Sequence, residues 1–286
     1  MSYLRACILA VSAFATLGFL LPTAAVAQDK GLRSLQTGDD SRGWEAVGRL
    51  DLGDRGFCTG ALIAEDLVLT AAHCLFDKTS GVSIDVRDIR FLAGWRNGRA
   101  AAYRGVSKAL AHPEYVYGGH DSAERVPFDV ALLQLDQPIR LPSVRPYATD
   151  ARPQTGDEVG VVSYAQDRAE APSLQQVCHV LGRQSILRAG VVVKPGGAEF
   201  DTLVLSCDVD FGSSGAPVFS LRDGALRIVS VISAKAEVDG QKVSLGTPLA
   251  DHVAFLRGKL AEGGSSLRPS HVRVLSGGSG GKFVKP

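Results

Sequence analysis

The sequence predicts an all-β protein, built as a sandwich or as barrels, with one helix near its end. Most apolar residues lie in short runs of about four to eight, rich in Val, Ile and Leu and separated by turn residues, as in proteins with many short strands. Glycine is abundant, at 32 of 286 residues. Prolines cluster between the two halves of this pattern, at Pro138, Pro142, Pro146 and Pro153, and predict a linker there.

The first 27 residues predict a signal peptide. Arg5 supplies a positive start, residues 6–21 are apolar, and Ala25-Val26-Ala27 has the small-x-small pattern read by signal peptidase. A transmembrane anchor is the alternative, but the apolar run is short for a span of ~20 residues. We therefore expect cleavage before Gln28 and a protein that is secreted or periplasmic, with no membrane contact afterwards.

The remaining elements follow in chain order. Residues 28–43 are polar and predict a loose entry segment, which further processing could remove as a propeptide. The helix is expected over 249–260, with Val253, Leu256 and Leu260 on one face, and the Gly/Ser-rich residues 262–286 predict a flexible tail. The expected strands are 46–50, 59–63, 67–71, 89–93, 130–135, 158–164, 176–183, 203–206, 216–221 and 226–233.

Charge and cysteine content narrow the function classes. Lys and Arg total 31 against 30 for Asp and Glu, a balance that argues against binding to nucleic acid or an anionic membrane and is compatible with a monomer. Cys7 leaves with the leader, and the even number that remains, Cys58, Cys74, Cys178 and Cys207, predicts two disulfides in an exported protein.

The sequence predicts neither a metal nor a cofactor. The histidines other than His73 lack paired metal-ligand spacing, namely His112, His120, His179, His252 and His271. A loop with Asp77, Asp85 and Asp88 has the side chains for calcium, but a solvated acidic loop is the preferred interpretation.

Three segments carry residues suited to nucleophilic catalysis. His73 ends an apolar strand in Leu69-Thr70-Ala71-Ala72-His73-Cys74, and Asp129 begins the strand Asp129–Leu135, where a carboxylate is costly unless it is paired. Ser214 lies in Gly212-Ser213-Ser214-Gly215-Ala216-Pro217, where glycines allow a sharp backbone bend. Taken singly, each segment also has a structural interpretation: His73 as a structural histidine, Asp129 as a strand-edge aspartate, and the Ser214 segment as a polar hairpin.

Together these segments resemble the signatures of the trypsin/chymotrypsin-like serine peptidases. Thr-Ala-Ala-His-Cys stands at 70–74, Asp-x-Ala-Leu-Leu-x-Leu at 129–135, and Gly-Ser-Ser-Gly-Ala-Pro replaces the usual Gly-Asp-Ser-Gly-Gly-Pro. The segment His112-Pro113-Glu114-Tyr115 resembles a further family loop, and residues 207–214 resemble the bacterial branch around glutamyl endopeptidases. The resemblance covers about 44–260 and implies a chymotrypsin-like fold of two six-stranded antiparallel barrels, over 44–145 and 146–261, with the helix at the end of the second.

The resemblance also implies the chemistry. Ser214 would attack a peptide carbonyl, His73 would take and return its proton, and Asp129 would orient the imidazole. The backbone N–H groups of Gly212 and Ser214 would form the oxyanion hole. The implied function is a serine endopeptidase that hydrolyses proteins or peptides through an acyl-enzyme, without a cofactor.

The resemblance selects one of the three possible disulfide pairings. It joins Cys58 to Cys74, beside His73, and Cys178 to Cys207, ahead of the Ser214 loop.

Two departures from the family pattern bear on activity. Ser213 stands where animal members carry the aspartate that receives a freed N-terminal amine, and no Ile-Val-Gly-Gly start is present, so we expect the oxyanion loop to order without that switch. An α/β-hydrolase is disfavoured because its chain order is Ser, Asp, His. A non-catalytic binding module on the same fold remains the second hypothesis.

The substrate pocket is the least determined feature. Asp208 lies six residues before Ser214, which by resemblance to trypsins favours a basic residue at the cleavage site. Glutamyl endopeptidases instead use a histidine on the pocket strand, where this chain has Ile232 before Ser233. Lys235 is an electrostatic alternative, so basic, small apolar and acidic preferences all stay open.

Overall fold

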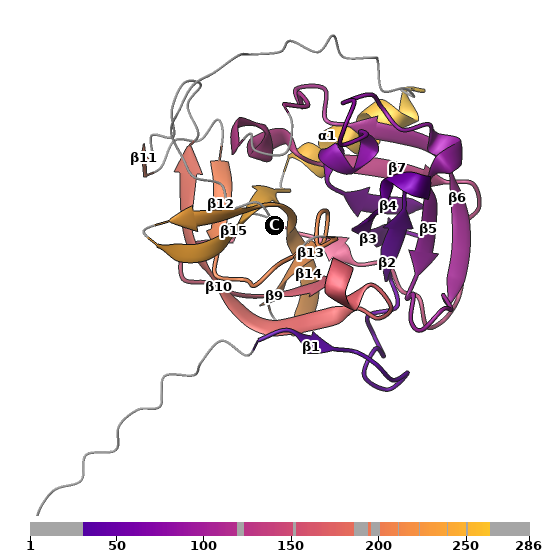
Figure 1. Cartoon of the computed structure of the whole chain (residues 1–286), viewed down its shortest axis with the longest axis horizontal. Coiled ribbons are helices and arrows are strands. Elements are labelled where there is room, and N and C mark those ends of the chain that lie inside the picture. Colours follow the sequence, from indigo (N-terminus) through magenta and orange to yellow (C-terminus); the bar gives the residue numbers. More distant parts are fainter. Residues whose placement is uncertain are drawn as a thin grey trace, which may run out of the picture.

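The computed structural model describes residues 31–118, 123–150, 153–185, 194–195, 201–210, 212–222, 224–238, 240–249 and 251–263. These ranges do not include the predicted leader with Cys7, the histidines His120 and His271, or the tail beyond Gly263. Two closed antiparallel barrels stand side by side (Figure 1), which confirms the predicted fold class. Over the described ranges, no helix has the length and apolarity needed to cross a bilayer.

The first barrel closes in the order β2-β3-β4-β7-β6-β5. Its interior is filled by fully buried apolar side chains, among them Leu50, Leu62, Phe91 and Leu133. Its strands are β2 (Val47–Asp51), β3 (Phe57–Ala64), β4 (Leu67–Thr70), β5 (Arg90–Ala93), β6 (Ala102–Ala111) and β7 (Ala131–Leu135). Short 3-10 helices connect them, namely η1 (Gly53–Arg55), η2 (Ala72–Leu75), η3 (Val86–Asp88) and η4 (Ala123–Phe128).

The second barrel closes because β9 pairs with both β10 and β13. Its strands are β9 (Glu158–Ser163), β10 (Ser173–Ser185), β12 (Asp201–Leu205), β13 (Pro217–Arg222), β14 (Ala225–Val238) and β15 (Gln241–Pro248). The 3-10 helix η5 (Gln166–Arg168) links β9 to β10. Three two-residue strands join the edges: β1 (Arg33–Ser34) and β11 (Lys194–Pro195) pair with β10, and β8 (Ala148–Thr149) pairs with β14.

An apolar layer joins the two barrels. Leu69 and Leu132 of the first barrel share one buried cluster with Tyr164, Phe219 and Val231 of the second. Burial of such side chains stabilises by about 1.5–3 kcal/mol each. This layer holds the loops of both barrels in register along their common edge.

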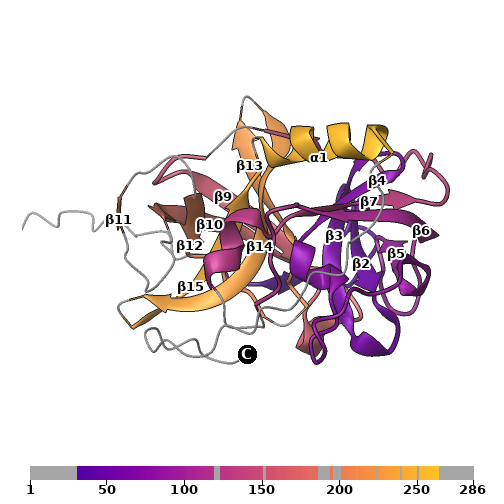
Figure 2. The ribbon, with the colours of Figure 1, turned by 90° about the horizontal axis from the view of Figure 1, so that it is seen from above.

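The C-terminal helix α1 (His252–Ala261) packs across to the first barrel, against β6 and β7 (Figure 2). Its buried face consists of Val253, Leu256 and Leu260, as the sequence predicts. The helix begins three residues later than expected because Pro248 still pairs with Ser230 as part of β15, which holds the chain extended up to that point.

The prediction of a loose entry segment is wrong for residues 31–43. Arg33 and Ser34 pair with β10, and the N–H of Leu35 donates to the carbonyl of Pro172 at 2.8 Å. Leu35 is fully buried in the cluster between the barrels. A single apolar side chain therefore ties this polar segment to the core, and its proteolytic removal stays a prediction.

Two long strands of the structure, β6 and β15, were not predicted from the apolar runs of the sequence. In β6, exposed or half-buried residues separate the buried positions, and the half-buried ones include Arg104 and Lys108. In β15, buried positions are occupied by Ser244, Gly246 and Thr247. Small residues buried inside a barrel give no apolar signal, so these strands escape a search for hydrophobic runs.

Candidate active site

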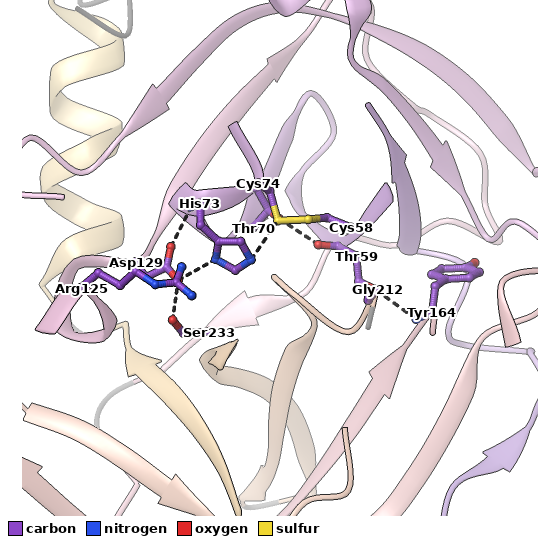
Figure 3. Close-up of a disulfide and its surroundings, with 10 residues drawn as sticks. All are labelled: Cys58, Thr59, Thr70, His73, Cys74, Arg125, Asp129, Tyr164, Gly212 and Ser233. Atoms are coloured by element: carbon purple, nitrogen blue, oxygen red, sulfur yellow. Dashed lines mark hydrogen bonds and ion pairs between the residues drawn. A yellow bond between two sulfur atoms is a disulfide. The ribbon is translucent and has the colours of Figure 1, made fainter. Parts of the chain in front are cut away.

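His73 lies in η2, directly after β4, and is held by Asp129 through two bonds (Figure 3). Its ring Nδ1 is 2.7 Å from Oδ2 of Asp129, and its backbone N–H donates to Oδ1 at 2.8 Å. A carboxylate at Nδ1 favours the tautomer that carries its proton there, which leaves Nε2 as a lone-pair base.

Asp129 is fully buried between η4 and β7, and donors surround its carboxylate. Besides His73, the Ser233 hydroxyl donates to Oδ2, and Nη1 of Arg125 lies 3.3 Å from the same oxygen. Burial alone would raise the pKa of this carboxyl. The charges of His73 and Arg125 and the hydrogen bonds outweigh that effect, so the pKa lies below its ordinary value and the group stays ionised.

The pKa of His73 lies below the ordinary histidine value. Burial is the main cause, because it disfavours the imidazolium. Asp129 opposes the shift, and the positive charge of Arg125 adds to it. A neutral imidazole at neutral pH has the protonation state that a general base needs.

The two predicted disulfide pairings are confirmed. Cys58 and Cys74 are bonded beside His73, and Cys178 and Cys207 are bonded ahead of the Ser214 loop. His73, Cys58 and Cys74 also form a compact group of metal-type ligands. Because both sulfurs are consumed by the disulfide, this group has no thiolate to offer a metal.

The Ser214 loop reaches the first barrel through backbone bonds to Thr59 on β3. The Thr59 N–H donates to the Ser214 carbonyl at 2.8 Å, and its hydroxyl donates to the Gly212 carbonyl at 2.8 Å. The same hydroxyl accepts from the N–H of Tyr164, after β9, at 3.0 Å. Thr59 is therefore a polar clamp between the barrels.

Position 215 requires glycine for two reasons, its positive φ angle and the close approach of neighbouring atoms. Its φ is +75°, in the region that L side chains rarely adopt. A Cβ there would lie 2.1 Å from Oγ1 of Thr70 and 2.5 Å from the carbonyl oxygen of Thr59. The loop after Ser214 can approach the strand leading to His73 only because this side chain is missing.

The structure brings two of the three expected catalytic side chains into direct contact. His73 and Asp129 are bonded, and the Ser214 backbone is docked on the neighbouring strand. Among the hydrogen bonds of the described residues, none joins the half-buried Ser214 hydroxyl to the His73 ring. In the same part of the chain, the N–H groups of Gly212 and Ser214 donate to no protein acceptor, which leaves both available to a ligand.

Ser213 is buried and hydrogen-bonded within the second barrel. Its hydroxyl donates to Oγ of Ser163 at 3.1 Å and accepts from the Asp210 N–H at 3.2 Å. A neutral side chain with these partners has no need of an incoming amine, in line with the expected independence from an N-terminal switch.

The residues expected in the substrate pocket have separate partners. Ser233 is buried with its hydroxyl on Asp129, and Lys235 pairs with Asp210 at 2.8 Å. Asp208 is exposed, and its N–H donates to Oε1 of Gln175 at 2.6 Å. The structure thus places Ser233 at the His73–Asp129 pair and does not gather these three side chains around one point.

Sequence reasoning missed Arg125 altogether. The available signal was its position four residues before Asp129, a spacing at which an arginine and an aspartate can pair. In a segment without a helical pattern, that spacing carries little weight, and burial of the pair is a tertiary property.

Comparisons with known proteins agree with this geometry. A family model described as Trypsin matches residues 37–255. Granzyme E of Mus musculus is 31% identical over 116 residues, which are 39% of this chain and 42% of the granzyme, so the match spans less than half of that relative. A solved structure titled "Structure of Glu endopeptidase in complex with MPD" superposes with a TM-score of 0.61 over 82% of this chain and 98% of the other, at 16% identity.

Proposed function

The chain belongs to the trypsin family, and from that premise we propose that it is an exported serine endopeptidase. The observation that carries the proposal is the buried His73–Asp129 pair, joined at 2.7 Å, next to a glycine-bounded loop that presents Ser214. A serine hydroxyl is a weak nucleophile until a neighbouring base takes its proton.

In the proposed mechanism, Ser214 attacks the substrate carbonyl while Nε2 of His73 accepts the hydroxyl proton. Asp129 holds the Nδ1–H and stabilises the imidazolium that forms. His73 then returns the proton to the leaving amine, and water hydrolyses the acyl-enzyme by the same route. The Ser214 hydroxyl has to come within hydrogen-bond distance of Nε2 on substrate binding, as catalytic hydrogen bonds often tighten only in the complex.

We propose that the N–H groups of Gly212 and Ser214 form the oxyanion hole. Gly212 has a φ of +90°, and a Cβ there would lie 2.4 Å from the Phe57 ring, so only glycine fits this turn. Thr59 holds the Gly212 carbonyl on the opposite side of the chain. Losing one oxyanion donor typically costs ~3 kcal/mol of transition-state stabilisation.

The two disulfides support export, because such bonds persist in oxidising compartments. With the predicted signal peptide, they favour a secreted or periplasmic enzyme. We propose that it acts on proteins or peptides and, given the near-zero net charge, as a monomer.

For specificity, we propose that Asp208 favours a basic residue at the cleavage site. The charge of Lys235 is already paired with Asp210, which weakens the alternative in which this lysine selects an acidic residue. Cleavage of a mixed peptide library checks the proposal: a preference for Arg and Lys that disappears in Asp208→Ala supports it. A preference for Glu that depends on Lys235 would replace it.

The decisive experiment is labelling of the purified protein with a fluorophosphonate probe, followed by mass spectrometry of the modified peptide. We expect one label on Ser214, lost in Ser214→Ala and strongly slowed in His73→Ala. A matched control is Ser107→Ala, whose hydroxyl bonds only the carbonyls of Gln134 and Leu135. A folded wild-type protein that takes no label would favour the non-catalytic binding module.

A further inference from the structure

Arg125 is a buried cation placed against the proposed catalytic carboxylate. Its side chain is 4% exposed, and its Nη1 lies 3.3 Å from Oδ2 of Asp129. The same oxygen receives Nδ1 of His73 and the Ser233 hydroxyl, and Figure 3 shows the guanidinium beside the imidazole. Three donors, one of them permanently charged, therefore compete for one carboxylate oxygen.

The backbone next to Arg125 is anchored on the second barrel. Val126, the next residue of η4, is fully buried in a cluster of the second barrel with Val204, Val243 and Leu245. Its carbonyl accepts the Thr247 hydroxyl at 2.6 Å. The helix η4 is anchored on the second barrel, and Asp129 lies just ahead of β7 of the first barrel. The guanidinium is therefore held against the carboxylate, away from solvent.

The guanidinium remains charged in this site. Burial opposes its charge, but Asp129 and Tyr115 outweigh that cost and raise the pKa of Arg125. An arginine keeps its proton at every pH at which an enzyme works. The field of this cation therefore acts on His73 at all working pH values.

We propose that Arg125 is a positioning residue that extends activity to more acidic pH, by competing with the imidazolium for Asp129 and so keeping His73 unprotonated. The proposal rests on the proposed function. A catalytic aspartate that pairs only with histidine favours the imidazolium, whereas one shared with a fixed cation favours it less.

The other titratable groups that face this site do not act on the protonation of His73 as Arg125 does. Lys78, which is exposed, also disfavours the imidazolium, and partial desolvation lowers the pKa of its amine. Burial raises the pKa of Tyr115 and of Tyr117, so both phenols stay neutral near the site at working pH. Arg125 is thus the permanently charged cation in direct contact with the carboxylate among the described residues.

The test is the pH dependence of kcat/KM on a peptide substrate for Arg125→Met, Arg125→Gln and Arg125→Lys. The two neutral variants should move the acid limb upward by about one pH unit, whereas Arg125→Lys should stay near wild type. KM should change less than about twofold, because a side chain this buried does not touch substrate. The matched control, Arg140→Met, removes an exposed pair with Glu65 and should leave the acid limb in place.

A second readout does not depend on activity. In a Ser214→Ala background, the His73 ring can be titrated by NMR, and Arg125→Met should raise its titration midpoint by the same amount. If the wild-type protein takes no fluorophosphonate, the proposed function fails while this titration still tests the role of Arg125.

An unchanged His73 midpoint in both neutral variants would overturn the proposal and leave Arg125 a purely structural residue. If neither neutral variant folds, the wild-type titration can still overturn the proposal. A midpoint at or above the ordinary histidine value of 6.5 would overturn the inference.

Discussion

The two barrels hold their proposed catalytic elements in opposite ways. On the first barrel, His73 is fixed by side chains: a carboxylate with several donors, and a disulfide on the adjoining Cys74. On the second, the Ser214 loop is fixed by backbone bonds to Thr59 and by the missing side chain of Gly215. His73 is thus held by contacts of its side chain, whereas the Ser214 loop packs closely because Gly215 has no side chain.

The difference suits the two roles. A general base needs a defined tautomer, which requires a specific partner at Nδ1. A nucleophile has to move towards the substrate carbonyl, so its hydroxyl is better left without a strong protein partner while its backbone is held still. Variants that attack each kind of support separately can break or sharpen this comparison.

The largest effect should follow loss of the base. His73→Ala should lower kcat by at least ~10⁴-fold, because base and nucleophile act as one unit. Steady-state kinetics measures it, with thermal unfolding to show that the fold persists. Activity within about tenfold of wild type would contradict the role of His73.

The next largest effect should come from adding a side chain at Gly215, in the Ser214 loop. Gly215→Ala puts a methyl group 2.1 Å from Oγ1 of Thr70 and should cost about 3–5 kcal/mol of unfolding free energy, along with most activity. Gly224→Ala is the matched control, since Gly224 has a similar φ of +74° but open space around it. Urea unfolding compares them, and equal losses would mean that φ, and not packing, decides.

Removing each disulfide should separate stability from catalysis. Replacing both cysteines of either bridge by alanine should cost about 3 kcal/mol, because each closes a loop of comparable length, with sequence separations of 16 and 29. Only loss of Cys58–Cys74 should also slow the labelling of Ser214, since Cys74 adjoins the base. Equal effects of both bridges on labelling would show that the disulfide does not position His73.

The polar clamp should give a smaller change. Thr59→Val keeps the shape but removes the hydroxyl that bonds the Gly212 carbonyl and the Tyr164 N–H, and should cost about 1–3 kcal/mol. Thr59→Ser restores the hydroxyl and should recover most of the loss in unfolding free energy and in kcat. A serine variant no better than valine would assign the effect to the methyl group.

The smallest effect is a pH-dependent one, at a histidine outside the catalytic pair. Burial, with the nearby His252, lowers the pKa of His112 to about 4. Between pH 6.5 and 4, the unfolded chain therefore binds a proton at His112 that the folded chain does not bind. The free energy of unfolding should fall by at most about 1.4 kcal/mol per pH unit as the pH drops through this range. His112→Phe should remove this slope, measured by urea unfolding at pH 7 and pH 5. An unchanged slope would mean that other groups control the acid response.

Local sequence pattern was enough to predict where the catalytic residues lie. The letters around His73, Asp129 and Ser214 resemble family signatures because each reactive side chain sits in a short segment whose neighbours fix its local backbone. Apolar runs likewise predicted most of the strands and the buried face of the C-terminal helix. These features depend on residues close together in the chain.

Tertiary structure decided what depends on partners far apart. Ser233 meets Asp129 across 104 positions, Thr59 meets Gly212 across 153, and Leu35 enters a core built from both barrels. Whether a polar group such as Arg125 is solvated or buried against a carboxylate depends on which segments pack over it. Local propensity and spacing do not encode that packing. The sequence by itself therefore predicts which residues are reactive, and the tertiary structure determines which partners hold them and shift their pKa values.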